Sequence, residues 1–122
     1  MWDRRATYIE NHDGDTVRMV LDQGFGDSKV IDIRLAGVWA PELNQPGGAD
    51  VSAFLRGWFF GHDLGQKWPF IVTTHRMKIA DREQKTFDRY VATVTTQDLK
   101  QNLNLEVIDY IRENGYTGGT GS

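Results

Sequence analysis

The clearest structural signal in the chain is the stretch Val30-Ile31-Asp32-Ile33-Arg34-Leu35-Ala36-Gly37-Val38. Its alternation predicts a β-strand, with the apolar residues Ile31, Ile33 and Leu35 on one face. Asp32 and Arg34 fall on the opposite face. Two opposite charges within so apolar a strand require a reason, which is either a structural ion pair or a functional site.

On either side of this stretch, hydrophobic periodicity and turn residues predict further strands and two helices. The first helix is expected to begin after a cap at Asp50 or Ser52 and to end near Gly65. The second is expected to begin at a cap of Asn104 and to end at Asn114-Gly115. The expected strands span residues 7–10, 16–21, 30–38, 70–79 and 89–95.

The order of these elements predicts a mainly β fold with helices, in the α+β class. Three strands, a helix, two strands and a helix is the order of a five-stranded OB-fold barrel. One helix then lies between strands three and four, and the other is C-terminal. We expect one OB-fold domain over residues 1–116 and a flexible, Gly-rich tail over residues 117–122.

Composition narrows the class of protein. The length of 122 residues suits one domain, and a hydrophobic content of 39% suffices for one core. The absence of cysteine excludes a disulfide framework and a thiolate metal site. The N-terminal residues lack a secretory apolar region, and no run reaches the roughly 18 apolar residues of a membrane span. We therefore expect an intracellular, cytoplasmic monomer without a membrane partner.

Three short motifs follow one another along the chain, and the first predicted helix lies between the second and the third. The net charge of −3 counts against a nonspecific polyanion binder, so the motifs carry the functional argument rather than the charge. They are Asp13-Gly14-Asp15-Thr16-Val17, then Ile33-Arg34-Leu35-Ala36-Gly37-Val38 followed by Ala40-Pro41-Glu42, and finally Asp88-Arg89-Tyr90-Val91-Ala92.

In these motifs the chain resembles the staphylococcal-nuclease (thermonuclease-like) family, over roughly Ile9 to Gly115. The resemblance implies a calcium-assisted phosphodiesterase on an OB barrel, cleaving DNA or RNA with limited sequence preference. Its partner would be nucleic acid, most suitably single-stranded.

The resemblance also implies a role for each catalytic position. Arg34 and Arg89 match two arginines that grip phosphate, and planar guanidinium groups bind two phosphate oxygens at once. Glu42 matches the glutamate that acts as general base on the attacking water. Lys85, in the basic segment before Arg89, and Phe87 stand at substrate-binding positions. Phe87 replaces a tyrosine that often touches phosphate in the family.

The metal site implied by the resemblance is incomplete in this chain. Asp15 matches a calcium-binding carboxylate, Asp13 a second acid near the ion, and Ala40 a residue that offers its backbone carbonyl. Trp39 stands where the family has an aspartate that binds the metal directly. Because calcium prefers several oxygen ligands, this replacement predicts a weakened Ca²⁺ site, for which Asp13 or Asp32 is a candidate compensation.

Three functions are compatible with these residues. The first is an active metal-dependent nuclease. The second is a catalytically impaired OB-fold module that binds nucleic acid or protein, as the replacement at Trp39 suggests. The third is a scaffold subunit that contacts protein through an acidic surface. In the simplest structural alternative, Arg34 only forms an ion pair with Asp32 or Glu42.

Overall fold

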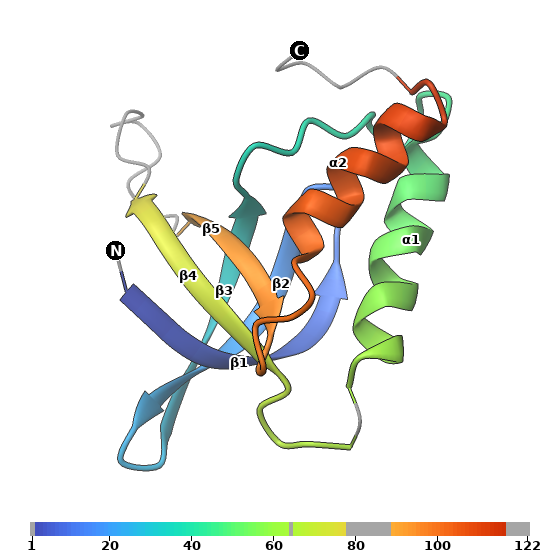
Figure 1. Ribbon diagram of the computed structural model, residues 1–122. Helices are drawn as coiled ribbons and strands as arrows, with labels where there is room; N and C mark the ends of the chain where they lie inside the picture. The colour runs from blue at the N-terminus through green and yellow to red at the C-terminus, as the bar shows by residue number, and fades with distance from the viewer. Residues whose placement is uncertain (1, 64, 78–88, 117–122) are drawn as a thin grey trace.

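The computed structural model describes residues 2–63, 65–77 and 89–116 (Figure 1). Within these residues the chain forms strands and helices in the predicted order. Their bounds are β1 Trp2–Asn11, β2 Thr16–Gly24, β3 Asp27–Leu35, α1 Gly48–Gly61, β4 Phe70–Met77, β5 Arg89–Thr96 and α2 Leu103–Glu113.

The strands close into a barrel in the order β1-β2-β3-β5-β4, with β4 returning to β1. All neighbours are antiparallel except β3 and β5, which are parallel. A parallel pair needs a long crossover connection, and α1 together with β4 lies within it. The predicted fold class is confirmed: the protein is a mainly β, OB-fold-like barrel with two helices.

The barrel interior is filled by the alternating apolar residues that the sequence predicts. Val17, Met19 and Leu21 of β2 are at most 1% exposed, and the apolar face of β3 is at most 3% exposed. Because successive strand residues point to opposite faces, burying this set leaves Asp32 and Arg34 on the outside of the barrel. The expected separation of an apolar and a charged face of β3 is therefore observed.

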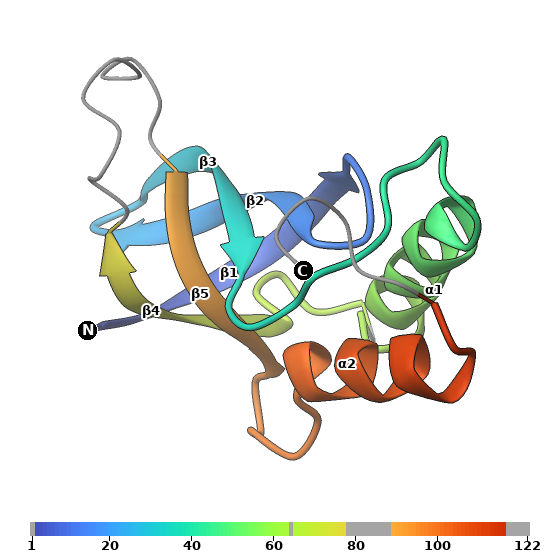
Figure 2. The same cartoon turned by 90° about the horizontal axis from the view of Figure 1, so that it is seen from above.

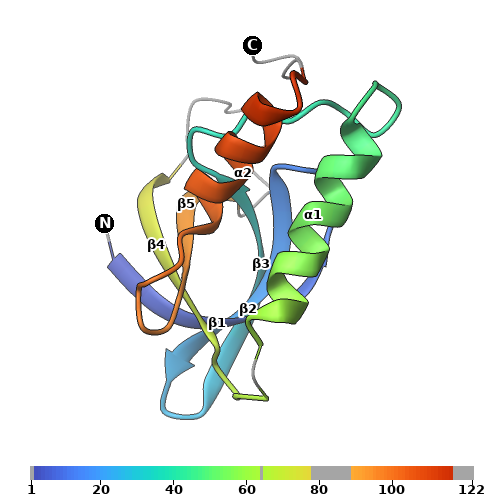
Figure 3. The same ribbon diagram turned by 45° about the vertical axis from the view of Figure 1, so that its right-hand side comes forward.

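The two helices lie side by side along one flank of the barrel (Figures 2 and 3). Helix α1 buries Val51, Leu55, Trp58 and Phe59 against the core. Between the helices, the rings of Phe54 and Tyr110 stack with their centroids 4.4 Å apart (a contact of α1 with α2). No helix among the described residues is long and apolar enough to cross a membrane.

The ends of α1 differ from the prediction. Its N-cap is Gly47, in a left-handed conformation with φ of 87°, and no side chain caps the helix. Asp50 lies in the first turn instead, and Ser52 is buried, where its hydroxyl accepts a hydrogen bond from Asn11 Nδ2 at 2.9 Å. The helix ends at Gly61 rather than near Gly65.

The N-cap of α2 was also predicted at the wrong residue. Asn102 is the cap, and its side chain accepts a hydrogen bond from Leu105 N at 3.1 Å. Asn104 is 3% exposed: its Nδ2 donates to the carbonyl oxygens of Ala36 and Ala92, and its Oδ1 accepts from Val94 N. It therefore joins α2 to β5 and to the end of β3. The predicted end at Asn114-Gly115 is confirmed.

Several strand boundaries also differ from the prediction. β1 is longer than residues 7–10 because it pairs with β2 on one side and β4 on the other. β3 begins at Asp27 and ends at Leu35, where Gly37 with φ of 75° turns the chain and Val38 N donates to Leu35 O. The end expected for the fourth strand, at residue 79, lies outside the described residues, as does the predicted tail 117–122.

Candidate functional site

The Asp13-Gly14-Asp15 turn is held closely against the end of β3. Asp13 Oδ1 accepts hydrogen bonds from Asp15 N and Thr16 N, both at 3.1 Å. Leu35 N donates to Asp15 O at 2.9 Å, and the register of β2 with β3 pairs Thr16 with Arg34. The first and second motifs therefore meet at one end of the barrel, where the loop after β3 leads to α1 (Figure 1).

At this end of the barrel the Arg34 guanidinium lies beside Asp15. Arg34 Nη1 is 3.5 Å from Asp15 Oδ2, and Nη2 donates to Val38 O at 3.4 Å. The alternative in which Arg34 pairs with Asp32 or Glu42 is not observed, because its ion-pair partner among the described residues is Asp15. Asp32 instead accepts a hydrogen bond from Arg18 Nε at 2.9 Å.

Asp15 holds its proton more tightly than an ordinary carboxylic acid. The residue is 8% exposed, and its pKa is raised to about 6. Desolvation by this burial is the largest cause, a hydrogen bond and charge repulsion from the neighbouring Asp13 carboxyl add to it, and Arg34 and the backbone of Ala40 oppose it. Two acids with insufficient positive charge between them form a site that a cation would stabilise.

The carboxylates fit a divalent cation only in part. Asp13 and Asp15 lie on the same turn and provide two carboxylates. Calcium is normally bound by six to eight oxygens, which is more than two carboxylates supply. No group of three or more His, Cys, Asp or Glu side chains close enough to hold a metal occurs in the described parts of the chain. Asp32, expected as a compensating ligand, is engaged by Arg18. A cation bound by Asp13 and Asp15 would therefore need further oxygens from water and from a substrate phosphate.

Ala40 approaches Asp15 through its backbone amide. Ala40 N donates to Asp15 Oδ2 at 3.3 Å, and the residue is 4% exposed. The metal role predicted for its carbonyl stays a prediction, since the observed contact involves the N–H group. The amide bond does fix the loop after β3 onto the Asp13-Gly14-Asp15 turn.

Glu42 lies on the same loop with its carboxylate exposed. Its backbone is fixed: Glu42 N donates to Gln45 Oε1 at 2.9 Å, and Glu42 O accepts from Gln45 N at 2.8 Å. Gly48 packs so closely that a Cβ there would lie 1.8 Å from Glu42 O. No hydrogen bond or ion pair joins the Glu42 carboxylate to Arg34 or Asp15 in the described structure, so this residue is near in sequence to the site but is not joined to it.

In the third motif, Arg89 is described only by its backbone. Arg89 is the first residue of β5 and pairs with Asp32 of β3, while Val91 pairs with Arg34. Arg89 therefore precedes by two residues the position on β5 that pairs with Arg34. Its side chain, and the predicted substrate-binding residues Lys85 and Phe87, lie outside what the structure describes.

The contact that the sequence analysis missed is between Trp39 and Arg34. The Arg34 Cζ lies 4.6 Å from the centroid of the indole ring, a cation–π arrangement. The sequence favours core or rim packing for Trp39 over base stacking, and the resemblance implies that it replaces an aspartate; neither interpretation includes a contact with Arg34. The turn at Gly37 folds the chain back after β3, and this turn is the sequence signal from which the contact could have been anticipated.

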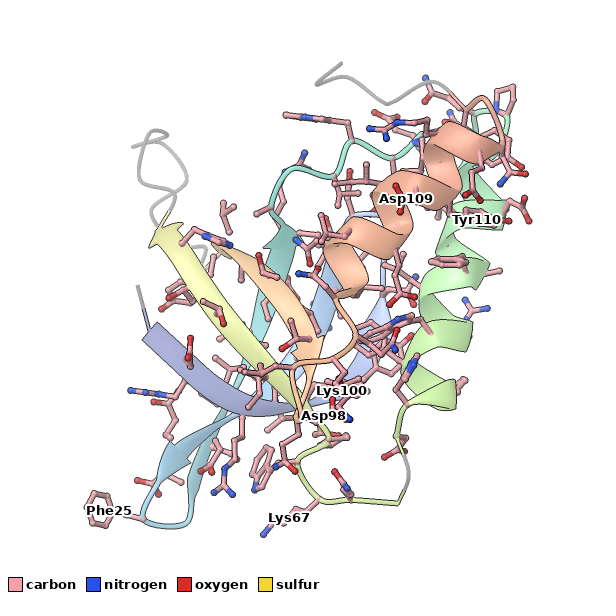
Figure 4. All side chains as sticks on the ribbon, viewed as in Figure 1. Phe25, Lys67, Asp98, Lys100, Asp109 and Tyr110 are labelled. Atoms are coloured by element: carbon pink, nitrogen blue, oxygen red, sulfur yellow. The ribbon has the colours of Figure 1, made fainter. Side chains whose placement is uncertain are left out.

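Two cavities lie away from these residues, toward the opposite end of the barrel. Phe25 projects from the tip of the β2–β3 hairpin there, and Lys67, Asp98 and Lys100 lie near the loops at the same end (Figure 4). One cavity of about 340 Å³ is lined by Arg5, Asp22, Phe25, Lys67 and Trp68, and one of about 300 Å³ by His62, Gln66, Gln97, Asp98 and Lys100. Neither contains a predicted site residue.

Comparison with known proteins adds no family to this picture. The chain matches no family model, and no curated protein matches it significantly. The likeness to the staphylococcal-nuclease family therefore rests on the three motifs, and any function has to be argued from the site.

Proposed function

We propose that this chain is a metal-dependent phosphodiesterase that hydrolyses DNA or RNA. The observation that carries the proposal is the meeting of Asp15 and Arg34 at the end of the barrel, with Nη1 and Oδ2 3.5 Å apart and Asp13 beside them. A carboxylate pair next to an arginine suits a phosphodiester, because it combines a place for a cation with a fork for phosphate oxygens.

In the proposed mechanism, the chain's own residues position the substrate and move one proton. Arg34 binds the phosphate oxygens, and Arg89 supplies the second guanidinium as charge develops on the phosphorane. Glu42, exposed on the loop after β3, takes the proton of the attacking water. As the water oxygen bonds to phosphorus, the bond from phosphorus to the leaving oxygen breaks, and that oxygen takes a proton from solvent. A divalent cation bound at Asp13 and Asp15 would supply Lewis-acid stabilisation of the phosphate charge.

Hydrolysis of a labelled single-stranded DNA, with Ca²⁺, Mn²⁺ or Mg²⁺ and with a chelator, tests the proposal. We expect cleavage that requires a metal and that is lost in Arg89→Ala. Arg112→Ala is the matched control, because Arg112 is an exposed residue of α2 whose ion-pair partner is Asp109. Absence of cleavage above buffer with all three metals would contradict the enzymatic function.

A second candidate, a nucleic-acid-binding module without turnover, is favoured by the contact of Trp39 with Arg34. The indole stands where a carboxylate would complete the cation site, and the described acids supply only part of a ligand set. This candidate predicts salt-sensitive binding of oligonucleotides without hydrolysis. A protein scaffold, the third possibility, predicts no salt-sensitive oligonucleotide binding.

A further inference from the structure

The Trp39 side chain is exposed although both of its chain neighbours are buried. Its two chain neighbours, Val38 and Ala40, are 0% and 4% exposed, whereas Trp39 is 48% exposed. The buried neighbours anchor the backbone on both sides, so the indole is held at the surface rather than left on a free loop. Arg34 is its one aromatic or cationic contact among the described residues.

Arg34 retains N–H donors for which the described residues provide no acceptor. Its guanidinium carries five N–H groups, and its two bonds, from Nη1 to Asp15 and from Nη2 to Val38 O, are 3.5 and 3.4 Å long. Both are at the long limit for hydrogen bonds. Nε has no acceptor within the described structure, and the side chain is 27% exposed. The guanidinium is therefore oriented by its neighbours and still able to bind an anion.

We propose that Arg34 and Trp39 form one nucleotide subsite, in which Arg34 binds a phosphate and the open part of the Trp39 ring stacks on the adjacent base. The phosphate part of this subsite rests on the proposed function, and the base part goes beyond it. Its ligand is a single-stranded DNA or RNA segment, because only an unpaired, splayed base offers its face to an aromatic side chain.

The proposal gives the Trp39 replacement a positive role. A carboxylate at this position would add a cation ligand but repel the phosphate. An indole instead provides a surface on which a purine or a pyrimidine base can stack. The cation–π contact also holds the guanidinium in place. The guanidinium and the indole lie next to each other on the surface, so one nucleotide could contact the first with its phosphate and the second with its base.

The test compares two probes of equal length, measured in chelator so that neither is cleaved: a thymidine oligonucleotide and an abasic strand with the same phosphates. We expect Trp39→Ala to weaken binding of the thymidine strand about 5- to 100-fold, the range expected for losing one stacked base. Binding of the abasic strand should fall by a few-fold at most, and Trp39→Phe should restore most of the lost affinity. Phe25→Ala, an exposed aromatic at the far end of the barrel, is the matched control and should bind like wild type.

Equal weakening of both probes by Trp39→Ala would overturn the stacking subsite, since the indole would then only orient Arg34. Unchanged binding of both probes would overturn it as well. Hydrolysis with metal, measured separately on the wild type, keeps the two proposals apart. Wild type that shows the base-dependent loss without hydrolysis would retain the subsite and contradict the phosphodiesterase. If wild type hydrolyses DNA and Trp39→Ala leaves oligonucleotide binding unchanged, the phosphodiesterase is retained and the stacking subsite is contradicted.

Discussion

Gly14 and Ala40 are in such close contact that no side chain fits between them. A Cβ at Gly14 would lie 2.6 Å from Ala40 Cβ and 2.6 Å from Val51 Cγ1. Gly14 is the centre of the first motif, and Ala40 belongs to the loop that carries Trp39 and Glu42. The glycine therefore allows the carboxylates of the turn to approach the loop after β3 and the helix α1.

Gly14→Ala is expected to destabilise the protein by about 1–3 kcal/mol, as overpacking of a filled interior does. Neither neighbour is the flexible end of a long side chain, so backbone has to move. Denaturant unfolding measures the loss. Gly57→Ala is the matched control, because nothing lies within 4 Å of its added Cβ inside α1, and it should be neutral or stabilising by up to about 1 kcal/mol. Equal effects of the two changes would contradict the packing argument.

The raised pKa of Asp15 predicts a pH-dependent stability. In the folded chain this carboxyl has a pKa of about 6, above the value near 3.9 of an unfolded chain. The folded state thus binds the proton more tightly, and the associated stability is present below about pH 4 and lost as pH rises through 6. Asp15→Asn should remove this loss, which we put at about 1–2 kcal/mol with solvent screening included. Unfolding of both proteins from pH 4 to 7 measures it, and identical profiles would contradict the assignment.

Asn104→Ala should be among the more destabilising single substitutions in the chain. It removes two donated bonds, of 2.9 and 3.0 Å, and one accepted bond of 3.0 Å. Ala36 O and Val94 N lose their bond to Asn104, whereas Ala92 O keeps the bond from Ala36 N at 2.8 Å. We expect a loss of roughly 2–4 kcal/mol. Asn102→Ala, which removes only the cap of the same helix, should cost about 1 kcal/mol. Thermal or urea unfolding of both variants checks the order, and a larger effect at Asn102 would refute it.

If the chain hydrolyses nucleic acid as proposed, Glu42 and Arg34 should affect different kinetic constants. Glu42→Gln removes the base without removing a substrate contact, so kcat is expected to fall about 10²- to 10⁴-fold with little change in KM. Arg34→Ala removes a phosphate contact made before and during the reaction, so KM should rise as well. Glu113→Gln, at the exposed end of α2, is the control for the first change. A Glu42→Gln variant with full kcat would exclude Glu42 as the base.

Several features could be predicted because they depend on neighbours in the chain. The alternation of Ile31, Ile33 and Leu35 gave the buried face of β3, since side chains in a strand alternate whatever the strand pairs with. The caps could not be predicted in the same way. Gly47 replaces the expected Asp50 or Ser52 because the close approach of Gly48 to the Glu42 carbonyl fixes where α1 begins.

The amino-acid order by itself determined the succession of strands and helices, the apolar faces and the presence of two charges on an apolar strand. Only the tertiary structure decided which partner Arg34 takes. The register of β2 with β3 brings Asp15 to the end of the strand, and the turn at Gly37 returns Trp39 over the guanidinium. Such contacts join residues from separate segments, and their free energy depends on burial and geometry that exist only once the barrel has closed.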